Sequence, residues 1–243
     1  MKKKYPPLVI TSAVLPGDVP FLEMRNSTQR VAKYLRAIDV WLDKIPDIQI
    51  VLCDGTGFDW SDIVREKYPD YHFECLYFIN DINGVKNYGK GFGEIEILNF
   101  AIDNSSYVNE QSRFMKITGK YWVNNICKFD DDDLFCDFKC KSTFLISKWK
   151  LLYINSAFFI CSSRAYRKYF YNSRALINDH TGNDLEHVMG GIIASNNIKN
   201  YQFKRSPAIA GWSGTSNTSF DLSSITLKDK IRELKYRILS CVL

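Results

Sequence analysis

The first half of the chain alternates strand patterns with helix patterns, and this alternation constrains the fold more than any other feature. The apolar, β-branched run Leu8–Val14 stops at a Pro-Gly pair and predicts a buried strand. Apolar residues then recur at helical spacing after Ser27 or Thr28, which we expect to cap a helix, until Pro46 ends it. A strand, a short helix and another strand follow, over Ile48–Cys53, Ser61–Lys67 and Phe73–Phe78. Strands separated by helices predict a mostly parallel sheet with crossover helices.

The second half of the chain has a less regular pattern. Two apolar segments, Phe144–Trp149 and Tyr153–Cys161, predict an antiparallel pair of strands. Asn183–Ser195 predicts a helix, and Gly211–Ser219 predicts a loop rich in Gly, Ser and Thr. Because no repeat, low-complexity segment or long linker interrupts the sequence, we expect a single domain over residues 1–226.

The C-terminal segment, residues 227–243, predicts an amphipathic helix with many basic residues. Its apolar face consists of Leu227, Ile231, Leu234, Ile238 and Val242, and lysines and arginines lie around the rest of it. Such a helix could bind an anionic membrane surface, or it could dock onto the domain. The sequence leaves both interpretations open.

The composition excludes several classes of protein. A net charge of +5 in 243 residues is mild, and no Lys/Arg tract interleaved with aromatic residues is present, so we expect no nucleic-acid partner. No apolar stretch approaches the about 18 to 20 residues of a membrane span, and no signal-peptide pattern follows the basic N-terminus. The expected location is the cytoplasm, with peripheral binding to the cytoplasmic face of a membrane as an option.

The seven cysteines are an odd number and are scattered along the chain, which indicates reduced thiols. Cys136 and Cys140 have the spacing of a ligand pair. They lack a second Cys or His pair that would complete a zinc site.

The segment Arg113–Asn125 predicts a buried strand that ends in a glycine turn. Lys116, Thr118 and Lys120 occupy alternate positions, so on a straight strand they share one face. Tyr121 adds a hydroxyl group beyond the turn. Cationic and hydroxyl groups at the end of a strand suit phosphate oxygens, and we therefore expect a nucleotide-binding edge here.

Asp54 and the segment Tyr88–Glu94 are two further candidates for ligand binding. Asp54 directly follows a strand, where a carboxylate can accept hydrogen bonds from a base or ribose; an ordinary Asp-Gly turn is the competing interpretation. In Tyr88–Glu94, three glycines and Lys90 precede a helix predicted from about Gly93 to Ile102, so exposed amides there suit an anion. The competing interpretation of Glu94 is that its negative charge in the first helical turn only interacts favourably with the helix dipole.

The acidic run Asp130–Asp133 suggests a Mg²⁺ or Mn²⁺ site. Successive side chains point apart along a strand or helix, so the four carboxylates cannot converge on one ion. Two carboxylates at positions i and i+2, such as Asp131 and Asp133, could bind one ion together if they lay in a loop. A solvated turn is the competing interpretation.

Carboxylates and imidazoles gather at a predicted helix start within Asp179–His187. Asp184 or Asn183 could cap the helix, whereas Glu186 flanks its apolar stripe and could project into a cleft. Glu186 is therefore the best candidate for a general base, with Asp184 as the second.

The small-residue loop Pro207–Ser216 has hydroxyl groups and amides, at Ser213 and Gly214 among others, that suit a phosphate or a sugar. Trp212 could stack on a sugar ring. A surface loop without a ligand is the competing interpretation.

Taken together, the motifs resemble bacterial glycosyltransferases encoded with O-antigen and capsule biosynthesis, which have a GT-A-like, Rossmann-type nucleotide-sugar fold. The resemblance covers roughly residues 8–220. It rests on the whole set of motifs and on their order along the chain, not on any single motif. The motifs are a helix carrying Arg30, Val-Leu-Cys-Asp54-Gly, Gly-Lys-Gly-x-Gly-Glu94, Phe-x-Lys-x-Thr-Gly-Lys-Tyr121, Asn-Asp-x-Glu186 and Gly-x-Ser-Gly214.

The resemblance implies an α/β fold with a mostly parallel central sheet flanked by helices, a small antiparallel element and the C-terminal helix. The residues that it places near the base and ribose are Thr11, Ser12, Arg30 and Asp54. Those that it places beside the donor site are Lys90, Gly91 and Glu94.

The family usually holds a divalent ion on the donor diphosphate with an Asp-x-Asp motif, and this slot reads Thr118-Gly119-Lys120-Tyr121 here. The departure favours a site without a metal, in which Lys116 and Lys120 stabilise the diphosphate. A site with Mn²⁺ or Mg²⁺ on Asp131 and Asp133 is the alternative.

The resemblance therefore implies transfer of a hexose from a nucleotide sugar, with UDP as the expected nucleotide, to a hydroxyl group of a lipid-linked oligosaccharide. The expected pathway is O-antigen, capsule or lipopolysaccharide biosynthesis. Glu186 or Asp184 would deprotonate the acceptor in an inverting reaction, or position substrate in a retaining one. The alternatives are a non-catalytic nucleotide- or polysaccharide-binding module and a metal-dependent nucleotidyltransferase that uses Asp130–Asp133.

Overall fold

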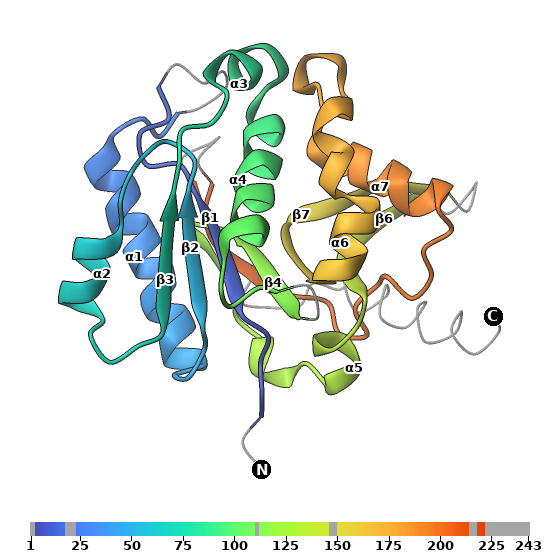
Figure 1. Cartoon of the computed structure of the whole chain (residues 1–243). Coiled ribbons are helices and arrows are strands. Elements are labelled where there is room, and N and C mark those ends of the chain that lie inside the picture. The colour runs from blue at the N-terminus through green and yellow to red at the C-terminus, as the bar shows by residue number, and fades with distance from the viewer. Residues whose placement is uncertain (1–2, 18–22, 110–111, 146–149, 214–217, 222–243) are drawn as a thin grey trace.

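The computed structural model of the chain describes residues 3–17, 23–109, 112–145, 150–213 and 218–221. One mixed sheet lies between two layers of helices, and a second, smaller sheet is also present (Figure 1). The helix expected over residues 227–243 lies outside the described residues, as does Gly214. Within the described ranges, no helix combines the length and the apolar character needed to cross a bilayer.

The central sheet has six strands in the order β3-β2-β1-β4-β7-β6. Their bounds are β1 (Leu8–Ser12), β2 (Ile50–Asp54), β3 (Phe73–Tyr77), β4 (Arg113–Thr118), β6 (Phe138–Leu145) and β7 (Lys150–Ser162). β1 to β4 are parallel, β7 is antiparallel to β4, and β6 is antiparallel to β7. The expected α/β class, with a mostly parallel sheet and an antiparallel pair, is confirmed. The predicted bounds of that pair are wrong, because β6 begins well before Phe144.

The small sheet is antiparallel and has the order β5-β8-β9. Its strands are β5 (Tyr121–Val123), β8 (Ile209–Trp212) and β9 (Ser219–Asp221). The loop predicted over Gly211–Ser219 is wrong at both ends, which belong to β8 and β9. The physical reason is that β5 presents backbone groups after the turn that follows β4, and β8 pairs with them.

Helices cover both faces of the central sheet (Figure 1). One layer contains α1 (Ser27–Lys44) and α2 (Ser61–Lys67), and the other contains α4 (Lys90–Asn104), α6 (Ser163–Tyr169) and α7 (Leu185–Ser195). The shorter elements are α3 (Ile82–Tyr88), α5 (Asp131–Leu134) and the 3-10 turns Ile126–Lys128, Tyr171–Leu176 and Asp179–Thr181. In β1, Leu8 and Ile10 pack toward α1 while Val9 packs toward α4, so the whole strand is buried.

The start of α1 differs from the prediction. Asn26, rather than Ser27 or Thr28, caps the helix, because its side-chain oxygen accepts a hydrogen bond of 2.9 Å from the Gln29 amide.

The glycine-rich segment also differs from the prediction. α4 begins at Lys90 rather than near Gly93, so Gly91 lies inside a helix and not in a loop. α4 follows α3 after a single residue, Gly89, whose φ of 99° favours glycine.

Gly119 joins β4 to β5 at a point where a side chain has no room. A Cβ atom there would lie 1.9 Å from Tyr34 Cε1 and 2.6 Å from the backbone oxygen of Thr11. We expect Gly119→Ala to destabilise the protein by about 3 kcal/mol, because a backbone oxygen cannot move aside as a flexible side chain can. Denaturant unfolding measures the change.

Gly191→Ala is the matched control. Gly191 is an exposed residue of α7, and a Cβ atom there would meet nothing within 4 Å. Alanine should stabilise this position by up to about 1 kcal/mol. Equal effects of the two substitutions would contradict the close approach at Gly119.

Candidate functional site

A pocket of about 620 Å³ opens at the carboxyl ends of the parallel strands. Its wall includes Thr11 and Ser12 at the end of β1, Thr56 after β2, Asn80 after β3 and Thr118 at the end of β4. In a sheet of this kind the carboxyl ends of the strands are where ligands bind, so the position of the pocket agrees with the expected nucleotide-binding edge. Its volume lies within the usual range of small-molecule sites.

Lys116 lies beneath the pocket and does not line it. The side chain is fully buried, and its Nζ donates to Glu94 Oε1 at 2.5 Å, to Thr118 Oγ1 at 2.9 Å and to the Ser156 carbonyl at 2.7 Å. These bonds use all three protons of the ammonium group. Lys116 therefore organises the groups under the pocket, and its ammonium is not presented to a ligand.

Glu94 forms the acidic half of this buried ion pair. Its Oε1 also accepts hydrogen bonds from Thr118 Oγ1 at 2.6 Å and from Thr11 Oγ1 at 3.3 Å. Burial alone would raise the pKa of Glu94, but the Lys116 ammonium and the two threonine hydroxyls outweigh burial and hold the pKa below its usual value. Glu94 is thus an ionised, fixed carboxylate in the pocket wall.

Two other cations, Arg30 and Lys120, face the pocket directly. Arg30 is 3% exposed and donates to the carbonyls of Ala13 and Met24, at 2.7 and 2.8 Å. Lys120 is 5% exposed, and its Nζ lies 4.9 Å from the ring centre of Tyr34.

The two cations repel one another. Burial lowers the pKa of Lys120; the nearby Tyr34 opposes this effect, and the positive charge of Arg30 adds to it. Among the residues that the structure describes, no carboxylate forms an ion pair with either group. Two neighbouring buried cations of this kind suit the binding of an anionic group.

Asp54 is fully buried behind the pocket wall and does not line the pocket. Its Oδ2 accepts from Ser12 Oγ at 2.6 Å and from the Val14 amide at 3.0 Å, and its Oδ1 accepts from Thr56 Oγ1 and the Thr56 amide, at 2.5 and 2.7 Å. The carboxylate thus joins the segments that follow β1 and β2. Asp54 therefore serves the Asp-Gly turn rather than a ligand. The Ser12 hydroxyl group donates its proton to Asp54 as well.

Glu186, in the first turn of α7, does line the pocket. Ser156 Oγ donates to Glu186 Oε1 at 2.5 Å. Burial raises the pKa of Glu186, the Ser156 hydrogen bond opposes this effect, and the charges of Glu94 and Asp184 add to it. A carboxylate with a raised pKa at the edge of a pocket has the properties of a general base.

Asp184, the second candidate base, does not line the pocket. It caps α7 by accepting from the His187 amide at 2.9 Å, and its Oδ1 lies 2.7 Å from His187 Nδ1. The structure therefore places Glu186 at the site and Asp184 at the surface beside it.

Of the glycine-rich segment, Lys90 lines the pocket and Gly91 does not. The Gly91 amide donates to Asp179 Oδ2 at 3.3 Å, so a carboxylate of the protein already occupies this amide at the start of α4. Burial raises the pKa of Asp179, and its contacts with Gly91 and Lys90 oppose the change.

Beyond the Gly119 turn, Tyr121 lines the pocket and Ser213 supports it. Burial raises the pKa of Tyr121, and a hydrogen bond with Ser213 opposes this effect. Trp212 is not part of the described wall: it lies against Trp122, with ring centres 6.3 Å apart, and below the Lys33 ammonium.

The acidic run lies on and beside α5, which Figure 1 places at the opposite end of the molecule from α3. Asp131 is exposed, whereas Asp133 is buried and accepts from the Lys204 amide at 3.1 Å. The Lys204 side chain binds Asp132. Over the described part of the chain, no three His, Cys, Asp or Glu side chains form a group that could hold a metal ion.

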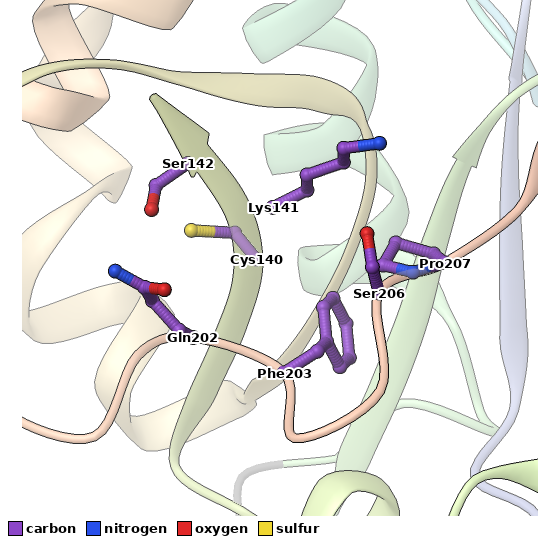
Figure 2. Close-up of a pocket in the computed structure, with 7 residues that line it drawn as sticks. All are labelled: Cys140, Lys141, Ser142, Gln202, Phe203, Ser206 and Pro207. Atoms are coloured by element: carbon purple, nitrogen blue, oxygen red, sulfur yellow. The ribbon is translucent and has the colours of Figure 1, made fainter. Parts of the chain in front are cut away.

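A second hollow, of about 20 Å³, lies between β6 and the segment 202–207 (Figure 2). Its volume is that of about one water molecule. It is too small for a substrate.

Sequence reasoning missed two residues that shape the site, Tyr34 and Ser156. Tyr34 accepts a hydrogen bond of 3.0 Å from the Ala13 amide and lies beside Lys120. Its signal in the sequence was the spacing from Arg30, which puts two polar groups on the buried face of α1. Ser156 had a weaker signal, as a polar residue inside an apolar strand.

Comparisons with known proteins give structural likenesses only. No family model matches the chain, and no curated protein matches it. Among solved structures, galactosyltransferase LgtC in complex with donor and acceptor sugar analogs has 9% identity over 77% of this chain and 69% of its own, with a TM-score of 0.45.

Two further solved structures are similar at a comparable level. Mouse xyloside xylosyltransferase 1 has 8% identity over 81% of this chain and 83% of its own, with a TM-score of 0.41. The 4-diphosphocytidyl-2C-methyl-D-erythritol synthase of Anaerococcus prevotii has 12% identity over 96% of this chain and 98% of its own, with a TM-score of 0.42. None of the three exceeds 12% identity or a TM-score of 0.45.

Proposed function

We propose that this chain is a glycosyltransferase that moves a hexose from a nucleotide sugar, with UDP as the first candidate nucleotide, to an acceptor hydroxyl group. The arrangement of the pocket is the observation that carries the proposal. Two buried cations without carboxylate partners among the described residues, Arg30 and Lys120, line the same pocket as Glu186, a carboxylate with a raised pKa. One part of the pocket thus suits a diphosphate, and another suits the removal of a proton.

In the proposed reaction the donor diphosphate lies against Arg30 and Lys120. The bond between the anomeric carbon and the diphosphate oxygen breaks, and the two cations stabilise the negative charge that develops on the leaving group. The acceptor oxygen forms the new bond to the anomeric carbon, and Glu186 takes its proton. In a retaining reaction, Glu186 would position the acceptor instead.

The proposed site stabilises the diphosphate with fixed cations rather than a metal ion. Lys120 would contact the phosphates directly. Lys116 would act through Glu94 and Ser156, because its protons are already bonded. The competing nucleotidyltransferase would hold Mg²⁺ or Mn²⁺ on Asp130–Asp133, and that run lies outside the described pocket wall.

For the acceptor we propose a lipid-linked oligosaccharide of O-antigen, capsule or lipopolysaccharide biosynthesis. This choice follows the resemblance of the sequence motifs. Because this acceptor is anchored in a membrane, we also propose that the protein binds peripherally to the cytoplasmic face of that membrane.

UDP should stabilise the protein in the presence of EDTA. A ligand at a hundredfold of its Kd stabilises the native state by about 2.7 kcal/mol, so the melting temperature should rise with UDP concentration. Lys120→Met should weaken UDP binding by at least about tenfold, since it removes one charged partner of the diphosphate. Thermal shift titrations with UDP, GDP and CMP, each with EDTA and with Mn²⁺, measure both effects.

Lys128→Met is the control, because Lys128 is exposed and does not line the pocket. Stabilisation that requires Mn²⁺ would contradict the metal-free site. No response to any of the three nucleotides would favour a polysaccharide-binding or structural module. A screen of common nucleotide sugars for release of the nucleoside diphosphate then identifies the donor.

A further inference from the structure

Ser156 lies where the strand β7 departs from regular pairing. The ladder between β6 and β7 is regular up to Cys140, after which Lys141 pairs with Asn155 and the intervening residues of β7 have no partner on β6. The Asn155 side chain stabilises this bulge by accepting a hydrogen bond of 2.9 Å from the Ala157 amide. Bulges redirect side chains and often occur next to active sites. This one places Ser156 and Ala157 in the pocket wall.

The hydroxyl group and the carbonyl group of Ser156 bind charged residues of the site. Its hydroxyl donates to Glu186 Oε1 at 2.5 Å, and its carbonyl accepts from Lys116 Nζ at 2.7 Å. The residue is only 4% exposed, so the two contacts are shielded from solvent. Lys116 is held in turn by Glu94, which fixes the backbone that carries the serine.

We propose that Ser156 is a positioning residue for Glu186: it holds one carboxylate oxygen of the base and leaves the other for the proton of the acceptor hydroxyl group. This assignment rests on the proposed function for its catalytic meaning. The hydrogen bond between Ser156 and Glu186 is present without any ligand, so it can be tested independently of the proposed function.

Ser156 also lowers the pH at which Glu186 becomes ionised. The charged groups around Glu186 are Glu94 from α4, Asp184 at the start of its own helix, and Lys116 on the far side of Ser156. Burial, Glu94 and Asp184 all disfavour the carboxylate, whereas the serine hydroxyl and, to a smaller extent, the Glu186 backbone amide donate to the charged form and favour it. The serine hydrogen bond thus lowers the pKa of Glu186 against the effect of burial and of the neighbouring carboxylates. A larger fraction of Glu186 is then ionised and able to accept a proton.

The test compares Ser156→Ala with the wild type in two measurements. The first is the titration of the Glu186 carboxyl carbon by NMR, with the signal assigned by its absence in Glu186→Gln. We expect this titration to move to higher pH in Ser156→Ala. The second is the pH dependence of kcat/KM, where the acid limb should move in the same direction and kcat/KM on that limb should fall about tenfold.

Two control variants separate positioning from packing. Ser156→Thr retains the hydroxyl group and should restore the wild-type titration. Ser142→Ala removes a hydroxyl from a residue of the same hairpin that is 7% exposed, and it should leave Glu186 unchanged. An unshifted titration in Ser156→Ala, or an equal shift in Ser142→Ala, overturns the proposal. If the titration shifts but the wild type transfers no sugar to any acceptor, the contact stands and the proposed function fails.

Discussion

Glu186→Gln should reduce the turnover of sugar transfer by at least about a hundredfold, the usual contribution of a general base. Glutamine has nearly the same shape and can still contact Ser156, but it cannot take the proton of the acceptor hydroxyl group. Binding of the donor nucleotide should be retained, because the cations Arg30 and Lys120 are unchanged. The measurement is kcat from release of the nucleoside diphosphate, together with UDP affinity. Near-normal turnover would remove Glu186 from the role of base.

Asp184→Asn is the matched control for this substitution. Asn caps helices as well as Asp does, so the start of α7 should be preserved, and Asp184 does not line the pocket. We expect its turnover to stay within about threefold of the wild type. A large loss in this variant would mean that the helix start, rather than the carboxylate of Glu186, governs the rate.

The stability of Glu186→Gln separates loss of chemistry from loss of fold. The pKa of Glu186 is raised in the folded protein, so its favourable contribution to stability is present below the unfolded pKa and is lost as the pH rises through the folded pKa. At neutral pH the ionised group therefore costs stability, and the neutral glutamine should be at least as stable. We therefore expect Glu186→Gln to be inactive and to have an unchanged or higher melting temperature.

Lys116→Met should destabilise the protein by about 3 kcal/mol or more. The substitution leaves Glu94 without its cation in a site where the side chains of Lys116 and Glu94 are 1% and 22% exposed. Removing one partner of a buried pair leaves an uncompensated charge, which is among the most destabilising single changes. Denaturant unfolding at neutral pH measures the loss.

The double variant Lys116→Met/Glu94→Gln should recover part of this stability, because it removes the stranded charge as well. Lys67→Met is the matched control: Lys67 binds Asp39 at 2.9 Å, but the side chains are 43% and 39% exposed. Removing an exposed pair should cost at most about 1 kcal/mol. If Lys116→Met costs no more than Lys67→Met, the buried pair does not organise the pocket as we infer.

Much of the fold could be predicted from the sequence, because its strands are short runs of buried residues between clear breaks. α3 was missed because Asn83, Gly84 and Asn87 are poor helix formers. The helix depends instead on a cap, since Asp81 accepts a hydrogen bond of 2.9 Å from the Gly84 amide. A cap followed by weak helix formers looks like a turn in sequence.

The candidate site was predicted in part. Strand alternation put Lys116 and Thr118 on one face, but it could not show that Glu94 of α4 covers that face and binds Lys116. Asp54 was placed at the correct strand end, whereas its hydrogen bonds to two separate segments depend on tertiary contacts. Such contacts decide whether a polar side chain serves the ligand or the fold.

The described wall of the pocket divides along the chain. The residues that suit the diphosphate, Arg30 and Lys120 among them, all precede β6, whereas Ser156, Ala157 and Glu186 come from the later half. The ladder between β4 and β7 joins the two parts within one sheet. If the proposed function holds, substitutions in the later half would change the acceptor, whereas those in the earlier half would change the donor.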